Sequence, residues 1–172
     1  MATWWLAIDL KYTSYDELKH RKVAAQGWPD LGNLLTLCAL VGAGDKDPFM
    51  GTVAALERIG YGHSTHANRV MWDLLNTKPG DLVVGIEGRS VKGICQLQKN
   101  GWESYQYHSP EAYNYAQTIG FPVEWVDWNP NLFGPPPATP GQAVQGIAGL
   151  QNESQRVADA WGKYREQHRK GV

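Results

Sequence analysis

The sequence has little of several things that would identify a protein class at once. Its only two cysteines, Cys38 and Cys95, stand in apolar stretches, which predicts buried free thiols in a reducing compartment, with a disulfide between them as the alternative. Its 16 basic and 17 acidic side chains leave a net charge of −1, which argues against binding nucleic acid through bulk positive charge. It contains no apolar run of transmembrane length and opens with no basic leader. We therefore expect a cytoplasmic protein that does not contact a membrane.

The sequence also lacks the common signatures of catalysis. The stretch GAGDKD, residues 42–47, has neither the spacing nor the Lys-Ser/Thr ending of a phosphate-binding loop. His63 and His66 stand three residues apart without an obvious third metal ligand, so a helix cap and a surface side chain are the simpler interpretation. No Ser-His-Asp order is recognisable. We expect a binding protein that has no catalytic residue, no metal site and no cofactor.

Aromatic side chains that carry a polar group are abundant, with eight Trp and eight Tyr against three Phe. Such side chains are enriched at surfaces that bind a partner. Trp28 is the most informative, because it lies within AAQGWPDLGN, residues 24–33, whose glycines and proline predict a surface turn. The indole either folds back to plug the rim of a core or forms the wall of a binding pocket. Aromatic residues in loops are plugs more often than walls.

The hydrophobic periodicity predicts an α+β protein. Strands are expected at residues 3–10, 81–86, 91–98 and 121–128, with a hairpin turn between the second and the third. Helices are expected at residues 14–22, 47–60, 64–76 and 152–169. The apolar run 34–43 fits either a buried strand or a buried helix, and most of 100–117 has no clear period, which is typical of a loop. Without a βαβ rhythm, a curved sheet or small barrel is favoured.

Several stretches share the motif order of one known domain type. Residues 66–97, HANRVMWDLLNTKPGDLVVGIEGRSVKGICQL, contain an Asn-Arg pair entering a helix, a Lys-Pro-Gly-Asp turn, a strand, a short hairpin and a returning strand that begins Val-Lys-Gly-Ile. With the opening TWWLAIDL, the Gly-Trp element AAQGWPDL and residues 141–161 before the last helix, the order resembles an EVE domain. EVE domains are a branch of the PUA-like superfamily, related to YTH and ASCH domains. Residues 1–172 would form one such domain, expanded by an insertion at about 33–63.

The resemblance implies a small, curved PUA-like β-barrel flanked by helices, with an aromatic pocket that takes in one modified nucleobase. Trp28 would be one wall of that pocket, and the aromatic segment after the returning strand would supply the opposite wall. The residues that the resemblance implies at the nucleobase are Trp28, Asp30, Asn68, Trp102, Tyr105, Tyr113, Tyr115 and Gln145. Those expected at the backbone phosphates are Lys11, His66 and Arg69.

The physical chemistry of base recognition agrees with a rigid aromatic loop. A base extracted from its stack needs flat surfaces and a few hydrogen bonds to its Watson–Crick edge. Stacking on one aromatic side chain contributes ~1–3 kcal/mol per base, whereas a buried methyl group adds only about 0.8 kcal/mol. Discrimination of a methylated base therefore requires a tight, preformed pocket, and Pro29 and the neighbouring turns would make the loop rigid.

These patterns favour a non-catalytic reader that flips a modified base, most simply a modified cytosine such as 5-methylcytosine in DNA rather than RNA, into the pocket. Domains of the resembled family occur in DNA restriction systems, which implies a nuclease or NTPase as a further partner. Two alternatives stay open. An ASCH-like amidohydrolase acting on a modified nucleoside would use a Lys, a Thr and a Glu, for which Lys11, Thr13 and Glu87 are the candidates. A protein-interaction module would use the aromatic surface itself.

Overall fold

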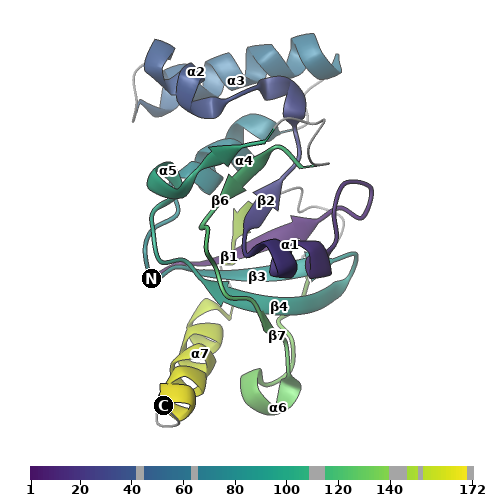
Figure 1. Ribbon diagram of the computed structural model, residues 1–172, viewed down its shortest axis with the longest axis vertical. Helices are drawn as coiled ribbons and strands as arrows, with labels where there is room; N and C mark the ends of the chain where they lie inside the picture. Colours follow the sequence, from purple (N-terminus) through teal and green to yellow (C-terminus); the bar gives the residue numbers. More distant parts are fainter. Residues whose placement is uncertain (42–44, 63–65, 109–114, 140–146, 151–152, 170–172) are drawn as a thin grey trace.

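The computed structural model of the protein describes residues 1–41, 45–62, 66–108, 115–139, 147–150 and 153–169. Its strands form a five-stranded sheet of order β7-β4-β3-β1-β8 and a three-stranded sheet of order β2-β6-β5 (Figure 1). The strands are β1 (Thr3–Ile8), β2 (Ala24–Gln26), β3 (Leu82–Glu87), β4 (Ser90–Gln96), β5 (Gln106–Tyr107), β6 (Gln117–Ile119), β7 (Val126–Asp127) and β8 (Ile147–Gly149).

The helices gather at the two ends of the molecule and beside the sheets. Figure 1 shows α2 and α3 together at one end and α6 and α7 at the other, with the five-stranded sheet between them. The helices are α1 (Tyr15–Arg21), the 3-10 turn η1 (Pro29–Leu31), α2 (Leu34–Val41), α3 (Lys46–Tyr61), α4 (Ala67–Leu75), α5 (Gly101–Ser104), α6 (Pro130–Phe133) and α7 (Ser154–Arg169). The predicted α+β class is therefore confirmed.

The centre of the large sheet combines a parallel and an antiparallel pair. Strand β1 runs parallel to β3, with Trp5 opposite Val84, and antiparallel to β8. Strand β3 turns back into β4 as an antiparallel hairpin that places Val84 opposite Ile94. This hairpin is the one predicted from the two apolar segments around the Gly-Arg-Ser turn.

The two faces of this sheet bury two separate hydrophobic clusters. Leu6 and Ile8 of β1 point into the larger cluster, which lies beneath α4 and the small sheet, while Trp5 points into the smaller one against α7. Strand β3 alternates in the same way, with Val83 in the larger cluster and Val84 in the smaller. Because side chains alternate along a strand, one strand can serve both clusters.

Several predicted helix boundaries agree with the structure. Ser14 caps α1 by accepting a hydrogen bond from Glu17 N at 3.2 Å. Helix α3 is capped at its C-terminus by Gly62, which has a left-handed φ of 71° and lies two residues beyond the predicted stop. The ambiguous apolar run forms helix α2 rather than a strand. Helix α4 begins at Ala67 rather than at the predicted residue 64, and the left-handed backbone of His66 (φ 64°) precedes its first turn.

The strand predicted at residues 121–128 is mostly wrong. Only Val126–Asp127 pairs, with β4, and the preceding residues leave the sheet. Trp125 is buried in the larger cluster instead, where its Nε1 donates to the carbonyl oxygen of Val23 at 2.9 Å. The part of this segment that precedes Val126 is therefore held by burial of the large indole in the core and not by hydrogen bonds to a neighbouring strand.

The segment 100–117, predicted mainly as loop, contains regular structure in its described part. Asn100 caps α5 by accepting a hydrogen bond from Glu103 N at 2.7 Å, and β5 and β6 pair with each other. These elements are two to four residues long, which is too short to produce a recognisable hydrophobic period. The described strands form two sheets and no closed barrel. None of the described helices is long and apolar enough to cross a membrane.

Candidate functional site

Gln117 of β6 holds the turn that carries Trp28. Its buried amide nitrogen donates to the carbonyl oxygens of Trp28 (3.1 Å) and Gly32 (3.2 Å). Its amide oxygen accepts from the hydroxyl of Tyr105, which in turn accepts the N–H of Leu34 at 3.0 Å. Both ends of the buried amide are hydrogen-bonded, so the network stabilises one arrangement of the turn.

Two tyrosine hydroxyls hold the same turn through η1. Tyr107 of β5 donates to the carbonyl oxygen of Pro29 at 3.3 Å, and Tyr61 at the end of α3 accepts from the N–H of Asp30 at 3.2 Å. Burial raises the pKa of Tyr61 to about 12. The carboxylate-bearing side chain of Asp30 is exposed, and its Cβ would lie 2.9 Å from a Cβ at Gly60. Helix α3 therefore packs closely against the turn.

The backbone of Trp28 lies in the left-handed region, with φ 58° and ψ 57°. This conformation costs a residue other than glycine roughly 1–2 kcal/mol, and such strain persists where the surrounding structure imposes it, often at binding sites. The indole is half-buried and packs against the edge of the larger cluster. The side chain therefore contacts the core and is partly exposed, and its role as a pocket wall stays a prediction.

A buried amide nitrogen two residues before Trp28 has no hydrogen-bond partner among the described residues. Gln26 is 5% exposed, and within the described residues its Nε2 has no hydrogen-bond partner. Gln26 is the register partner of Gln117 across β2 and β6, so the two side chains share one face of the small sheet. A buried unpaired donor costs about 1–3 kcal/mol, and it can form a hydrogen bond to a ligand that enters beside it.

His108 and Tyr115 flank the end of the same sheet. His108 Nε2 lies 3.1 Å from Thr118 Oγ1, and its ring meets the buried ring of Tyr115 edge-on, with centroids 6.2 Å apart. Burial, together with the nearby Arg21, lowers the pKa of His108 below its usual 6.5, which favours a neutral imidazole. Two further residues predicted at the nucleobase, Tyr113 and Gln145, lie outside the described residues.

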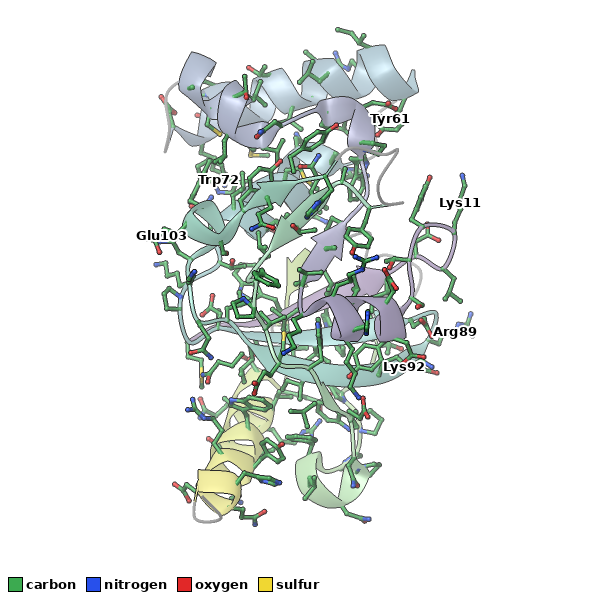
Figure 2. All side chains as sticks on the ribbon, in the orientation of Figure 1. Lys11, Tyr61, Trp72, Arg89, Lys92 and Glu103 are labelled. Atoms are coloured by element: carbon green, nitrogen blue, oxygen red, sulfur yellow. The ribbon has the colours of Figure 1, made fainter. Side chains whose placement is uncertain are left out.

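Trp102 belongs to a different aromatic cluster. Its ring lies 6.2 Å from Phe49 of α3, and Phe49 also contacts Trp72 at 5.6 Å. Because Phe49 and Tyr61 are separated along α3 by about 18 Å at the helical rise per residue, the structure does not bring Trp102 to Trp28. Figure 2 likewise places Trp72 on the side of the molecule opposite Lys11. Tyr105 supports the turn from beneath, because its hydroxyl donates to the Gln117 amide oxygen and accepts the N–H of Leu34.

The residues predicted at the first turn of α4 make local contacts. Asn68 Oδ1 accepts the N–H of Arg69 at 2.8 Å. Burial raises the pKa of Asp73, and the nearby Arg69 guanidinium partly opposes that rise. Arg69 and His66 are exposed, so both side chains face solvent at the end of α4 from which a phosphate could be reached.

The three residues considered for an amidohydrolase have different local environments. Glu87 accepts the N–H of Tyr15 at 3.0 Å with one oxygen and pairs with Lys92 Nζ at 3.2 Å with the other. The Lys11 ammonium lies over the neighbouring tyrosine ring, 5.1 Å from its centroid. The Thr13 hydroxyl is buried and has no partner within the described part of the chain. Both oxygens of Glu87 thus serve the start of α1 and the hairpin.

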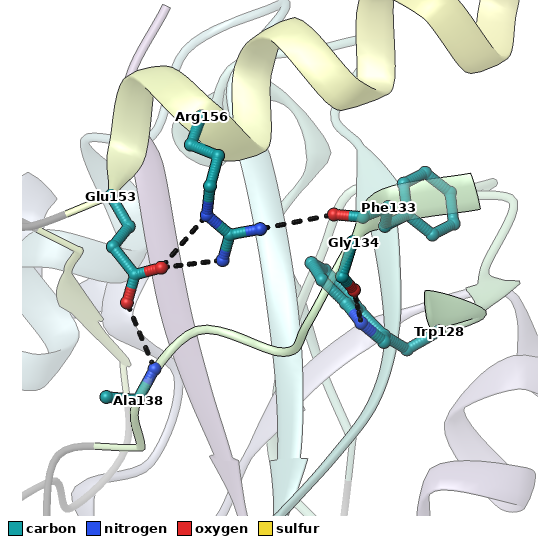
Figure 3. Close-up of polar contacts among 6 residues, drawn as sticks. All are labelled: Trp128, Phe133, Gly134, Ala138, Glu153 and Arg156. Carbon is teal, nitrogen blue, oxygen red and sulfur yellow. Dashed lines mark hydrogen bonds and ion pairs between the residues drawn. The ribbon is translucent and has the colours of Figure 1, made fainter. Parts of the chain in front are cut away.

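An open pocket of about 490 Å³ lies at the other end, between α6 and α7. Figure 3 shows that Arg156 is fixed there by Glu153 (Nη2 to Oε2, 2.6 Å) and by the carbonyl oxygen of Phe133 (3.2 Å). The indole of Trp128 donates to Gly134 O at 3.2 Å. These contacts connect α6 to α7, which is a structural role. The lining residues are Leu132, Phe133, Gly134, Pro135, Arg156, Asp159, Ala160 and Lys163.

Three residues at or beside the Trp28 turn were not predicted from the sequence: Gln26, Tyr61 and Gln117. The two glutamines stand at the ends of strands of three residues, which are too short to give a recognisable period in the sequence. No local signal existed for Tyr61 either, which is distant from Asp30 in the sequence.

Comparison of the chain with protein-family models, with curated proteins and with solved structures finds no match. Within the described residues, no group of three or more His, Cys, Asp and Glu side chains is placed to hold a metal ion.

Proposed function

We propose that this chain is a non-catalytic reader of a modified nucleobase in nucleic acid, with DNA favoured over RNA and a modified cytosine as the favoured base. In this proposal the fold is an expanded EVE-like member of the PUA-like superfamily. The base leaves its stack and lies against the open part of the Trp28 indole. A nuclease or NTPase that acts on the marked DNA is the partner proposed for it, as in a restriction system.

One observation carries the proposal: a half-buried indole is held in a strained backbone conformation by a hydrogen-bonded network. The backbone carbonyls of Trp28 and Gly32 are fixed by Gln117, so the ring is positioned before any ligand arrives. Preorganisation of this kind improves affinity by reducing the entropy lost on binding. The ring supplies a flat stacking surface, and the buried amide nitrogen of Gln26 supplies a donor for a base edge.

Two exposed basic side chains on one side of the molecule fit a ligand with a few phosphates. Lys11 is exposed, and Figure 2 shows it on the same side of the molecule as Arg89, which is also exposed. The net charge of −1 allows only a few phosphate contacts. Binding to unmodified duplex should therefore be weak and sensitive to salt.

The test is a binding titration of the full chain with duplexes that contain unmodified, methylated, hydroxymethylated or glucosylated cytosine, or methylated adenine. We expect tighter binding to one modified duplex, and the change Trp28→Ala should remove about 1–3 kcal/mol of that preference, the contribution of one stacked base. Trp128→Ala is the matched control, because Trp128 is a half-buried indole at the opposite end. Equal affinity for all five duplexes would contradict the proposal.

A further inference from the structure

The loop between β1 and α1 presents an apolar side chain to solvent. Leu10 at its tip is 66% exposed, and Tyr12 is 38% exposed. Lys11 stands between them, with its ammonium over the Tyr12 ring. The loop thus combines a protruding aliphatic side chain with a cation and an aromatic ring.

This loop is fixed rather than free to fold Leu10 back onto the protein. Three backbone N–H groups donate to Asp9: that of Lys11 to Oδ1 at 2.9 Å, that of Tyr12 to the carbonyl oxygen at 2.9 Å and that of Thr13 to the same carbonyl at 3.1 Å. Two residues later, the N–H of Tyr15 is bonded to Glu87. A turn held by hydrogen bonds to the side chain and carbonyl oxygen of one residue keeps its tip residue in one direction.

The loop lies on the same side as the Trp28 turn. Figure 2 shows Lys11 of this loop and Tyr61 of α3 on the same side of the molecule, and the Tyr12 phenol adds a small rise to the pKa of Tyr61, which is raised mainly by burial. Tyr61 in turn accepts the N–H of Asp30, two residues after Trp28. Figure 2 shows Lys11 on this projecting loop, away from Trp72 and Glu103.

We infer that Leu10 is a wedge that enters a DNA duplex at the position vacated by the base that stacks on Trp28, with Lys11 at an adjacent phosphate. This inference rests on the proposed function and adds to it how the base is extracted. Flipping a base breaks stacking and pairing, and proteins that distort a duplex insert Leu, Ile, Phe or Met between base steps. A leucine held outward beside a cation fits that task.

The experiment separates extraction of the base from recognition of the base. The full chain is titrated with 5-methylcytosine in a duplex and with the same strand alone, and a 2-aminopurine placed next to the modified base reports unstacking by its fluorescence. A single strand needs no wedge, because its base is already unpaired. Leu10→Ala should therefore weaken duplex binding about tenfold, the effect of losing one buried aliphatic contact, and abolish the fluorescence rise, while single-strand binding stays unchanged.

Two variants serve as controls. Leu10→Met keeps a long apolar side chain and should restore both duplex binding and the fluorescence rise. Ile59→Ala removes another exposed aliphatic side chain, 81% exposed on α3, and should leave both signals as in the wild type.

Three outcomes would overturn the inference. If the wild type prefers the methylated duplex but Leu10→Ala binds it equally well, the wedge is wrong and the reader proposal stands. If the variant loses single-strand and duplex binding equally, Leu10 contacts the base rather than replacing it. If the wild type shows no preference for 5-methylcytosine in the duplex or in the single strand, the proposal that the protein reads this base is wrong. The wedge proposal is then wrong as well.

Discussion

The two ends of the molecule are both rich in aromatic side chains, but they use them differently. At the α6–α7 end, Phe133 lies between the rings of Trp128 (5.2 Å), Tyr164 (5.3 Å) and Trp161 (6.2 Å). Phe133 and Trp161 are buried in the smaller cluster, and Trp128 and Tyr164 pack against it as partly buried side chains. At the Trp28 end, polar side chains hold the backbone of the turn, and the indole is only partly covered.

The aromatic residues at the α6–α7 end fill space against one another, whereas Trp28 is held so that its side chain stays partly exposed. A ring that stabilises a core needs other rings or aliphatic groups around it, and its backbone needs no special support. A ring kept half-exposed gains less from burial, so the chain uses a buried amide and two tyrosine hydroxyls to hold it. Each prediction below tests one side of this contrast.

The largest expected effect is at the packed end. Phe133 is 1% exposed, so Phe133→Ala should lower the free energy of unfolding by about 3–5 kcal/mol, as truncation of a buried aromatic side chain does. Urea titration measures the change. The adjacent Leu132 is 39% exposed, and Leu132→Ala should change stability by no more than about 0.5 kcal/mol. Similar losses for the two variants would mean that this cluster is loosely packed.

The next effect concerns the polar support of the turn. Gln117→Met keeps the length of the side chain but leaves the carbonyl oxygens of Trp28 and Gly32 without their donor. Unpaired buried polar groups should lower the free energy of unfolding by about 2–3 kcal/mol. Binding of the modified duplex should weaken as well, because the ring is no longer positioned. A variant that is as stable as the wild type would show that the amide network is dispensable.

A smaller effect tests the strain at Trp28. Glycine adopts a left-handed backbone without penalty, so Trp28→Gly should be more stable than Trp28→Ala by about 1 kcal/mol. Lys22 also has a left-handed backbone, with φ 57°, and the same pair of changes there provides the reference difference. If alanine is the more stable replacement at residue 28, the turn does not retain this conformation in solution.

The smallest effect is a dependence on pH near His108. Burial lowers the pKa of this side chain below the ordinary 6.5, so the unfolded chain binds its proton at a higher pH than the folded chain. Stability should therefore be complete above about pH 6.5 and decline as the pH falls below it towards the lowered folded-state pKa. In His108→Gln the decline should be shallower, whereas His20→Gln on the exposed face of α1 should keep the wild-type slope. Thermal melting between pH 7.5 and pH 5.5 compares the three proteins.

Local patterns predicted the parts of the fold that depend on local chemistry. The Ser14 cap, the β3–β4 hairpin and the stop of α3 near Gly60 are determined by neighbouring residues, and the structure has them. The segment around Trp125 could not be predicted in this way, because an apolar alternation that is typical of a strand is overridden when an indole finds a core site and a carbonyl partner.

The sequence pointed to Trp28, at the centre of the candidate site, but not to the residues that surround it. Trp28 was recognised because a large apolar side chain on a glycine- and proline-rich turn is unusual. The separation of Trp102 from Trp28 could not be predicted from the sequence, because its neighbour Phe49 is distant along the chain. The support from Tyr61 was hidden for the same reason, since contacts between distant segments leave no local period.

The order of strands in the large sheet has a consequence for how the chain folds. Strand β1 lies between β3 and β8, so Thr3 pairs with Leu82 and Trp4 pairs with Gly149, which are both far away in the sequence. The entropy of closing such long loops is lost before the contacts form, and proteins dominated by distant contacts fold slowly. The β3–β4 hairpin, whose strands are neighbours in the chain, can form first and offer β3 as a template for β1. The addition of β8 is then the late step that completes the sheet.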